Sequence, residues 1–217
     1  KKYKFKIIED ASHSFGGRYN SRRVGCSKWS DITVFSFHPV KIITTGEGGC
    51  CTTNKKKYYE KLVFLRNNGI TKDKKKFKYK NQGPWYYEQH SIGYNFRMSD
   101  IQSGLGISQL KNLKAFLSKR NSIAKVYHQN LKNLPIKFQK VEKNLYSTYH
   151  LFIIKLDAKY KHLHKFFFNY LRSKKLLVNV HYLPIHLQPF YRKLGFKEKQ
   201  FTVAEEYAKT AISIPIY

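Results

Sequence analysis

A lysine, a hydroxyl and a glycine-rich turn lie close together in the stretch SFHPVKIITTGEGG, residues 36–49. Lys41 follows Ser36 by five positions and has an apolar neighbour on each side. A lysine forms an imine with a carbonyl only as the neutral amine, which a site favours by desolvation or by a nearby cation. A serine hydroxyl can hold a phosphate group, and the glycines let the backbone turn tightly beside a bulky ligand. The stretch therefore indicates imine chemistry on a phosphorylated carbonyl compound.

A carboxylate and an imidazole follow the first apolar run of the chain, in KFKIIEDASH. Asp10 and His13 lie at the carboxyl end of this predicted strand, where ligands of open α/β sheets bind. A carboxylate there can hold a protonated ring nitrogen, and a ring three residues later can contact the same planar ligand. Taken alone, an aspartate after a strand is more often a helix cap.

Imine lysine, ring-nitrogen carboxylate and phosphate hydroxyl are the parts that a pyridoxal phosphate enzyme requires. The spacing of Ser36 and Lys41 is weak evidence alone, because 42 of the 217 residues are Lys or Arg and such a match is expected by chance. The ordered set of Asp10, His13, Ser36 and Lys41 is more specific.

Alternating strands and helices are expected to position these residues. Glycine and the periodicity of apolar residues predict strands within 4–13, 31–37 and 48–54, and a helix over 55–69 that ends at Gly69. Residues 70–94 show no clear periodicity, and a loop of that length is usually functional or mobile. A long helix follows, with Ser99 as its N-cap and Ile101, Leu105 and Leu110 on one face.

The sequence pattern of the remaining residues predicts a smaller α+β unit. It comprises a strand over 146–156, a helix over 164–176, a strand over 177–182 and a final helix over 202–213. We therefore divide the chain into a large domain, residues 1–115, and a small domain, residues 116–217, with the boundary region near 112–135.

Composition limits the classes of function. The 41% of hydrophobic residues allows a packed core, and no apolar run approaches the roughly 20 residues that span a bilayer. Neither a signal peptide nor a membrane partner is therefore expected. Three cysteines without a CxxC pair predict neither a disulfide framework nor a metal site, and make a reducing compartment such as the cytoplasm the expected location.

The formal net charge of +29 has two interpretations. A nucleic-acid binder is one, but the lysines are scattered through every segment and no recognised binding motif is present. Compositional bias, of the kind that AT-rich codons produce, is favoured. A basic binding module without catalysis, or a remnant that retains the fold, stays open as an alternative function.

Several stretches together resemble the DegT/DnrJ/EryC1/StrS sugar aminotransferases. They are IIEDASHSFGGRYNSRRVG, DITVFSFHPVKIITTGEGG and GYNFRMSDIQSGLGISQL. The resemblance extends over nearly the whole chain and is most specific around Lys41. It implies an α/β fold, the pyridoxal phosphate-dependent transferase fold of type I, similar to that of aspartate aminotransferase. The chain would supply the C-terminal part of the large domain and the small α+β domain.

Carried over position by position, the resemblance implies a role for each residue. Lys41 corresponds to the imine lysine that also moves the proton during catalysis, and Asp10 to the partner of the cofactor's pyridinium nitrogen. His13 stands where the family has Gln or His near the phenolic oxygen, and Ser36 corresponds to a phosphate-binding serine. Asn95 corresponds to an asparagine that reaches the phosphate of the neighbouring subunit.

Arg97 could act like Asn95, although loop polarity before a helix cap would explain both residues without the resemblance. Some family members are dehydratases with histidine at the lysine position, so Lys41 favours amino transfer. VNVHYLPIHLQPFYRKLGF, residues 178–196, resembles the branch that acts on UDP-linked 4-keto-6-deoxy-N-acetyl sugars. Tyr182 and His186 could contact the sugar there, or be a packed tyrosine and a loop histidine.

The function implied is transfer of an amino group from glutamate to a nucleotide-linked 4-keto-6-deoxy sugar, by a homodimer with shared active sites. Family members have a substantial segment before the strand that carries Asp10. We therefore expect this chain to behave as a fragment, with unpaired sheet edges, exposed apolar faces and weak or no cofactor binding by itself.

Overall fold

The computed structural model describes residues 3–79 and 82–217, and the chain divides into two compact units. The first unit comprises Lys1–Lys114 and Asn144–Thr148, and the second Ala115–Lys143 and Tyr149–Tyr217. The division of domains expected from sequence placed residues 144–148 in the small domain. They instead join the first unit, because β9 (Leu145–Tyr146) pairs with β2 (Arg18–Tyr19).

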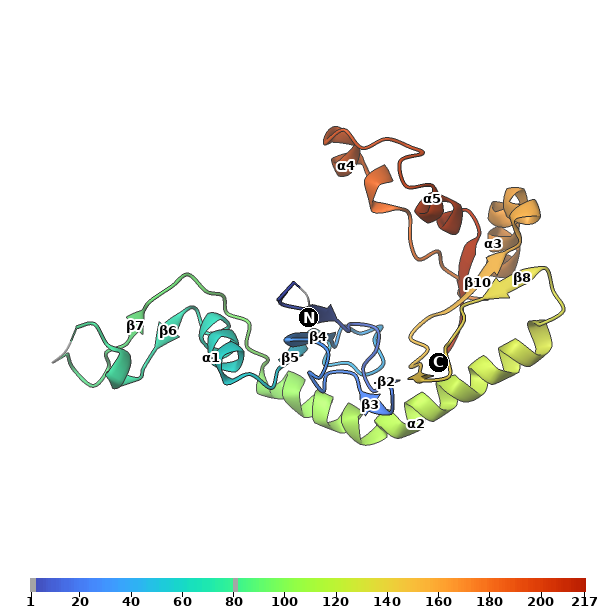
Figure 1. Cartoon of the computed structure of the whole chain (residues 1–217). Helices are drawn as coiled ribbons and strands as arrows, with labels where there is room; N and C mark the ends of the chain where they lie inside the picture. The colour runs from blue at the N-terminus through green and yellow to red at the C-terminus, as the bar shows by residue number, and fades with distance from the viewer. Residues whose placement is uncertain (1–2, 80–81) are drawn as a thin grey trace. The chain divides into compact units, whose positions relative to one another are not determined.

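A three-stranded sheet forms the centre of the first unit. Its order is β1-β4-β5, with β1 (Ile8–Asp10) parallel to β4 (Ile32–Ser36) and β5 (Gly49–Thr52) antiparallel to β4 (Figure 1). All three strands fall within the ranges predicted from the sequence. The β-branched and aromatic run of β4 explains why this strand lies centrally, since such side chains pack well on a pleated surface.

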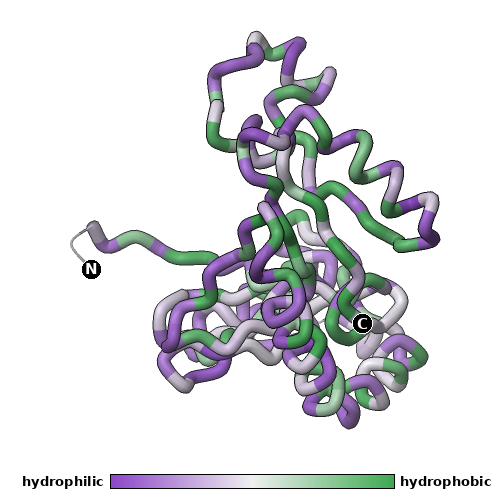
Figure 2. Tube along the Cα trace, turned by 90° about the vertical axis from the view of Figure 1, so that its right-hand side faces the viewer, coloured by the Kyte–Doolittle hydropathy of each residue, from purple (hydrophilic) through white to green (hydrophobic). Residues whose placement is uncertain are grey.

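One face of this sheet is packed and the other is open. Thr33 and Phe35 of β4 are buried, at 0% and 4% exposure, and Phe35 contacts the ring of Phe15 edge-on. The intervening residues of β4 and the edge strand β1 are less covered, and Ile8 of β1 is 68% exposed. Parallel strands are normally covered on both faces. Tyr3, Phe5 and Ile7 before β1 are also exposed, and lysines alternate with them in the purple and green segment that leads from the N-terminus (Figure 2).

The segment after β5 is more ordered than its sequence predicted. Helix α1 (Lys56–Leu65) is followed by β6 (Ile70–Thr71), a short 3-10 helix η1 (Lys74–Lys76) and β7 (Glu88–Gln89), and β6 pairs with β7. The carboxylate of Glu88 orders this segment, and the periodicity of apolar residues carries no signal of such a contact. The carboxylate accepts hydrogen bonds from the backbone N–H groups of Lys78 and Tyr79, each at 2.8 Å.

Helix α2 (Asp100–Leu131) begins at the predicted cap. The Ser99 hydroxyl accepts the N–H of Gln102 at 3.3 Å, and the Gln102 side chain accepts the N–H of Ser99 at 2.9 Å. This reciprocal pair is a capping box. The predicted apolar face is not buried, because Ile101, Leu105 and Leu110 are all exposed.

The second unit is a three-stranded antiparallel sheet with helices. The sheet has the order β11-β10-β8, from Ala211–Ile214, Phe152–Leu156 and Ile136–Phe138. Its helices are α3 (His164–Ser173), α4 (Pro189–Lys193) and α5 (Thr202–Ala208), and two 3-10 helices, η2 (Ala158–Leu163) and η3 (Ile185–Leu187), complete it. Phe152, Ile154 and Ile212 are buried in its core together with Ala124 of α2.

Two predictions for this unit were wrong. Residues 177–182 do not form a strand, and only an isolated bridge joins Asn179 to Ser213. The last predicted helix is shorter, because residues 211–214 leave it to form β11 against β10. Pairing with a distant strand decided this outcome, and local periodicity carries no signal of it. Within the described residues, no helix combines the length and apolar character that crossing a membrane requires.

Glu88 provides a test of this fold. Removal from water raises the pKa of its buried carboxyl, but hydrogen bonds from His90, Tyr79, Lys78 and Tyr86 outweigh this and lower the pKa from 4.5 to about 2. The carboxylate therefore contributes stability that is complete above pH 4.5 and is lost as the pH falls towards 2.

We expect Glu88→Gln to lower the free energy of unfolding at pH 6, because it removes the charged acceptor of these bonds. The difference from the wild type should shrink between pH 4.5 and pH 2, as measured by denaturant unfolding. The control is Glu60→Gln on the exposed surface of α1, which should have little effect at either pH. An equal difference at pH 6 and pH 2 would contradict the role of Glu88.

Candidate active site

The pairing of β1 with β4 places Asp10 and Ser36 on the same face of the sheet. Asp10 pairs in register with Val34, and Ser36 lies two residues further along β4 on the same side as Val34. Glu9 pairs with Thr33 on the opposite face, where the Thr33 hydroxyl donates to the Glu9 carboxylate at 3.0 Å. Asp10 and Ser36 end their strands, so both lie at the carboxyl edge of a parallel pair, where such sheets bind ligands.

Asp10 is held as a charged carboxylate. Its Oδ1 atom accepts the hydroxyl of Ser12 at 2.6 Å and the N–H of Ser12 at 3.0 Å. These two bonds lower the pKa of Asp10, partial burial opposes them, and the positive charges of His13 and Lys41 lower it further. The structure thus brings His13 and Lys41 close enough to Asp10 for their charges to act on it. No helix begins after Asp10, so the helix-cap alternative does not apply.

Lys41 lies between an exposed stretch of the chain and a buried one. Its side chain is partly buried, residues 38–40 before it are exposed, and Ile42 and Ile43 after it are buried. The Lys41 N–H donates to the carbonyl of His38 at 2.9 Å. The two buried isoleucines therefore anchor the backbone next to Lys41.

A set of hydrogen bonds closes the loop around Lys41. The carbonyl of Phe37 accepts the N–H of Thr45 and the hydroxyl of Thr44, each at 3.0 Å. Gln102 of α2 donates to the carbonyl of Glu47 at 3.0 Å. Gly48 completes the loop with φ +152°, where a Cβ would lie 2.3 Å from the hydroxyl of Thr45. The glycines of the sequence motif thus serve the closed loop that carries Lys41.

Ser36 makes a weaker contact of its own. Its hydroxyl accepts the N–H of His38 at 3.4 Å, and the side chain is only partly buried. His38 in turn faces the carboxylate of Glu47, with 3.9 Å between Nε2 and Oε1. The Ser36 hydroxyl therefore retains a proton that it can donate to an anion.

Asn95 and Arg97 lie on a different segment from these residues. Asn95 is exposed and forms an isolated bridge with Asn67, after the end of α1. The guanidinium of Arg97 donates to the side chain of Asn67. In the part of the chain that the structure describes, no hydrogen bond links Asn95 to Asp10, Ser36 or Lys41. These two residues are thus not part of the cluster around Asp10.

His186 and Tyr182, the candidates for sugar contact in the second unit, have contrasting environments. His186 is buried, and its Nε2 lies 2.8 Å from Oε1 of the buried Glu205. The same Glu205 oxygen accepts the N–H of Lys199 at 2.8 Å, and the bond to His186 lowers the pKa of Glu205. Tyr182 is 63% exposed. His186 therefore helps to hold its own unit together, while Tyr182 remains available for contacts.

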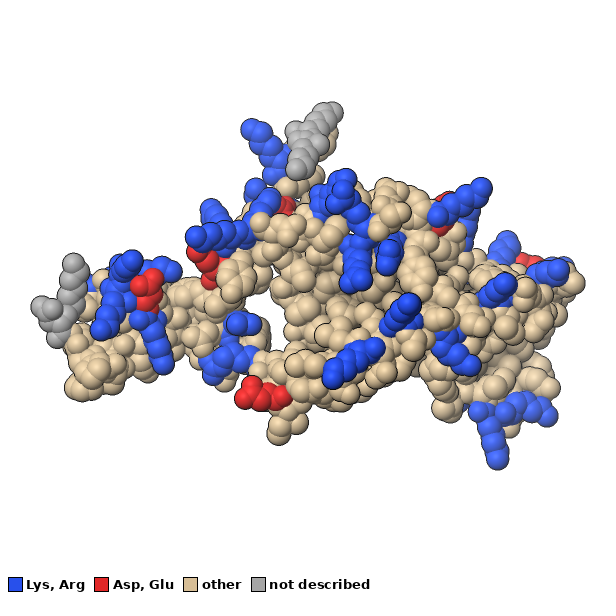
Figure 3. Space-filling model, turned by 90° about the horizontal axis from the view of Figure 1, so that it is seen from below, with Lys and Arg blue, Asp and Glu red and all other residues tan. Residues whose placement is uncertain are grey.

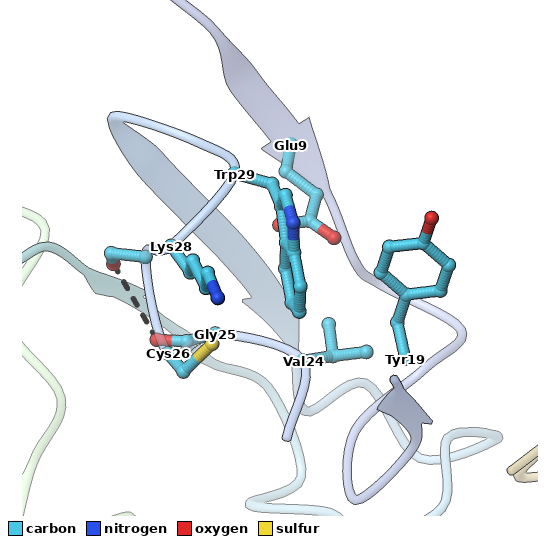
Figure 4. Close-up of a pocket in the computed structure, with 8 residues that line it drawn as sticks. Glu9, Tyr19, Val24, Gly25, Cys26, Lys28 and Trp29 are labelled. Carbon is cyan, nitrogen blue, oxygen red and sulfur yellow. Dashed lines mark hydrogen bonds between the residues drawn. The ribbon is translucent and has the colours of Figure 1, made fainter. Parts of the chain in front are cut away.

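A cavity of about 230 Å³ lies on the other face of β1. Its lining includes Glu9, Tyr19, Cys26 and Trp29, and the Glu9 carboxylate lies beside the rings of Trp29 and Tyr19 (Figure 4). The ring centroids of Tyr19 and Trp29 are 4.8 Å apart. Because Glu9 and Asp10 point to opposite faces, this cavity is separate from the Asp10 cluster.

Ser12 is the residue of this site that sequence reasoning missed. The signal was present as the triplet Asp-Ala-Ser, since aspartate side chains often accept the N–H two residues later. Gln102 was missed for another reason, because its contact with Glu47 spans 55 residues of chain.

The residues of the cluster fit pyridoxal phosphate as a donor set. An ionised carboxylate suits a pyridinium nitrogen, a serine hydroxyl at the carboxyl end of a strand suits a phosphate, and a lysine amine suits an aldehyde. Among the described residues, no group of three or more His, Cys, Asp or Glu side chains could hold a metal ion.

The 42 basic residues are spread through the whole sequence. Lys and Arg side chains are scattered over the visible face of the molecule, with few acidic ones between them (Figure 3). This distribution agrees with compositional bias and does not mark one nucleic-acid interface.

Comparison with known proteins gives one consistent result. The model of the DegT/DnrJ/EryC1/StrS aminotransferase family matches residues 1–217. The UDP-4-amino-4,6-dideoxy-N-acetyl-beta-L-altrosamine transaminase of Campylobacter jejuni is 36% identical, over 100% of this chain and 55% of that protein. The spore coat polysaccharide biosynthesis protein SpsC of Bacillus subtilis is 33% identical, over 97% of this chain and 54% of that protein.

Solved structures agree. PseC of Helicobacter pylori, an aminotransferase involved in the biosynthesis of pseudoaminic acid, matches with a TM-score of 0.86 and 32% identity, over 99% of this chain and 55% of that chain. Spr1654 of Streptococcus pneumoniae in its PLP form matches with a TM-score of 0.86 and 26% identity, over 98% of this chain and 53% of that chain. The expected type I fold is confirmed, and the chain spans about half the length of the relatives it matches.

Ser12 provides a test of the site. We expect Ser12→Ala to raise the pKa of the Asp10 carboxyl towards its ordinary value of 3.8, because the hydroxyl bond that contributes most to the lowering is lost. A carbon-detected NMR titration of Asp10 measures this shift. The control is Ser14→Ala, whose hydroxyl bonds the carbonyl of Ala11 and should leave the Asp10 titration unchanged. Equal titration curves for wild type and Ser12→Ala would contradict the assigned role.

Proposed function

The chain belongs to the DegT/DnrJ/EryC1/StrS aminotransferase family, and we propose that it carries the catalytic lysine of a pyridoxal phosphate-dependent sugar-nucleotide aminotransferase. The observation that supports this most is that Asp10 and Ser36 share the exposed face of the sheet, and that the charges of His13 and Lys41 act on the Asp10 carboxylate. The chain covers about half the length of its relatives, so in those proteins the enzyme also includes the part that this chain does not match.

Each residue of the cluster has a defined task in this proposal. When bound, pyridoxal phosphate supplies an aldehyde and a ring that withdraws electrons from the bond to be broken. Asp10, kept ionised by Ser12, holds the proton on the ring nitrogen. The Ser36 hydroxyl would donate to the phosphate. The Lys41 amine would condense with the aldehyde, releasing the aldehyde oxygen as water, and when free again would carry the proton that amino transfer requires. His13 contacts the edge of the ring.

The substrate we propose is a nucleotide-linked 4-keto-6-deoxy sugar, with glutamate as the amino donor. The support is the names of the relatives, among them the 36% identical transaminase of Campylobacter jejuni and a 28% identical GDP-perosamine synthase of Escherichia coli. Exposed Tyr182 is available to contact the sugar. We propose a cytoplasmic location, supported by three cysteines that are all unbridged.

We propose a homodimer in which Asn95 and Arg97 reach the phosphate in the partner's site. The support is that no hydrogen bond of the described residues links Asn95 to Asp10, Ser36 or Lys41, together with the exposed apolar side chains of its segment. Trp85, Ile92 and Phe96 are exposed by 80%, 85% and 71%. A run of large exposed apolar side chains marks a protein interface.

A chimaera tests the catalytic assignment. Residues 1–217 would replace the matching part of the Campylobacter jejuni transaminase. We expect Lys41→Ala to lower amino transfer to that enzyme's sugar nucleotide by roughly a thousandfold or more, since it removes nucleophile and proton carrier together. The matched control is Lys114→Ala on α2, which should leave turnover unchanged. Turnover that survives Lys41→Ala would overturn the proposal, and circular dichroism confirms that each variant is folded.

The same chimaera tests the dimer. We expect Trp85→Asp together with Phe96→Asp to shift it from dimer to monomer in analytical ultracentrifugation, because a buried interface does not tolerate two unpaired charges. Phe190→Asp in the second unit, at a side chain of similar exposure, is the control and should leave the dimer intact. A dimer that persists in the double variant would exclude this segment from the interface.

A further inference from the structure

The β-hairpin that follows Asp10 and His13 in the sequence carries three arginines. Strands β2 (Arg18–Tyr19) and β3 (Arg22–Arg23) are joined by Asn20 and Ser21, which have φ values of 45° and 62°. Two positive φ values in a two-residue loop are typical of a tight type I′ turn. Strand β9 pairs with β2 on the other side, and the Asn20 N–H donates to the carbonyl of Asn144 at 2.9 Å.

Arg18 and Arg23 are direct cross-strand neighbours. The Val24 N–H donates to the carbonyl of Gly17 at 2.9 Å, one of the two bonds of a hydrogen-bonded pair, while the Gly17 N–H donates to the carbonyl of Ser14. Because such pairs alternate along an antiparallel ladder, Arg18 and Arg23 form a non-hydrogen-bonded pair, with Cα atoms about 4.5 Å apart. This is the position at which cross-strand side chains come closest.

Two guanidinium groups in this position repel each other, and like charges directly opposite destabilise a sheet. Both arginines are exposed, and no ion pair of the described residues includes either of them. Folding alone therefore gives no reason for this pair. An anion that accepts hydrogen bonds from both guanidinium groups would remove the repulsion.

A phenol extends the same row. Tyr146 of β9 is the neighbour of Arg18 on its other side, so Arg23, Arg18 and Tyr146 lie side by side across three strands. Tyr146 is 38% exposed. Arg22 and Tyr19 point to the opposite face of the hairpin, where Tyr19 lines the cavity with Glu9.

We propose that Arg18 and Arg23 bind a diphosphate group, with the hydroxyl of Tyr146 as a third donor. Two neighbouring guanidinium forks match two linked phosphates, because each fork can donate two parallel hydrogen bonds to one of them. The site is built from β2, β3 and β9 and uses none of the residues assigned to pyridoxal phosphate. This inference rests on the proposed function in one respect, which is that the diphosphate belongs to a nucleotide sugar.

Binding of UDP to the full chain tests the proposal, by isothermal titration calorimetry at physiological salt. We expect Arg18→Gln and Arg23→Gln each to weaken UDP binding about tenfold, the loss of one charged hydrogen-bonding group. Arg22→Gln is the matched control, because it removes the same charge from the other face of the same hairpin. It should change the affinity by less than about twofold. Inorganic pyrophosphate should compete with UDP, and uridine should not.

Several results would overturn the proposal. Equal losses for Arg22→Gln and Arg18→Gln would show a general effect of charge. Competition by uridine would show that the affinity comes from the nucleoside. Binding of a short DNA duplex that pyrophosphate does not displace would show that Arg18 and Arg23 bind nucleic acid. Absence of UDP binding to a folded wild-type chain would also refute it. The test measures binding of UDP, which carries no keto sugar, so failure of amino transfer in the chimaera does not affect it.

Discussion

The candidate site depends on one register, the parallel pairing of β1 with β4 that sets Asp10 opposite Val34. Side chains alternate along a strand, so this register places Asp10 and Ser36 on the open face and Glu9 and Thr33 on the packed face. A slip of one residue would exchange the two carboxylates. Glu9 opposes such a slip, because its carboxylate accepts the hydroxyls of Ser30 and Thr33 at 3.1 and 3.0 Å.

Scarce carboxylates have structural tasks throughout this chain. Only 13 residues are acidic, against 42 basic ones, and several of the acidic side chains anchor backbone. The Glu88 carboxylate accepts backbone N–H groups of the segment before β7, and the Glu205 carboxylate accepts the N–H of Lys199. Few carboxylates remain to neutralise surface cations. The arginines of the β2–β3 hairpin are among the cations without an acidic partner in the described residues, and two of them, unlike the scattered lysines, are direct cross-strand neighbours.

The face of the sheet that carries Asp10 is exposed. Parallel strands are normally covered on both faces, yet Ile8 is 68% exposed beside Asp10. The relatives that the chain matches are almost twice as long. Asp10 is exposed, and Ser36 and Lys41 are partly buried. Exclusion of water strengthens each electrostatic interaction in a catalytic site.

The sequence alone determined the family, the type I fold, the strands around Asp10 and Ser36, and the capped start of α2 at Ser99. These rest on local signals, since motif order, apolar runs and cap residues are written in neighbouring positions. Only the tertiary structure decided the return of β9 to the first unit, the strand at 211–214 and the pairing of Arg18 with Arg23. These three join residues that are distant along the chain or set by strand register, and no local pattern encodes which partner a strand finds.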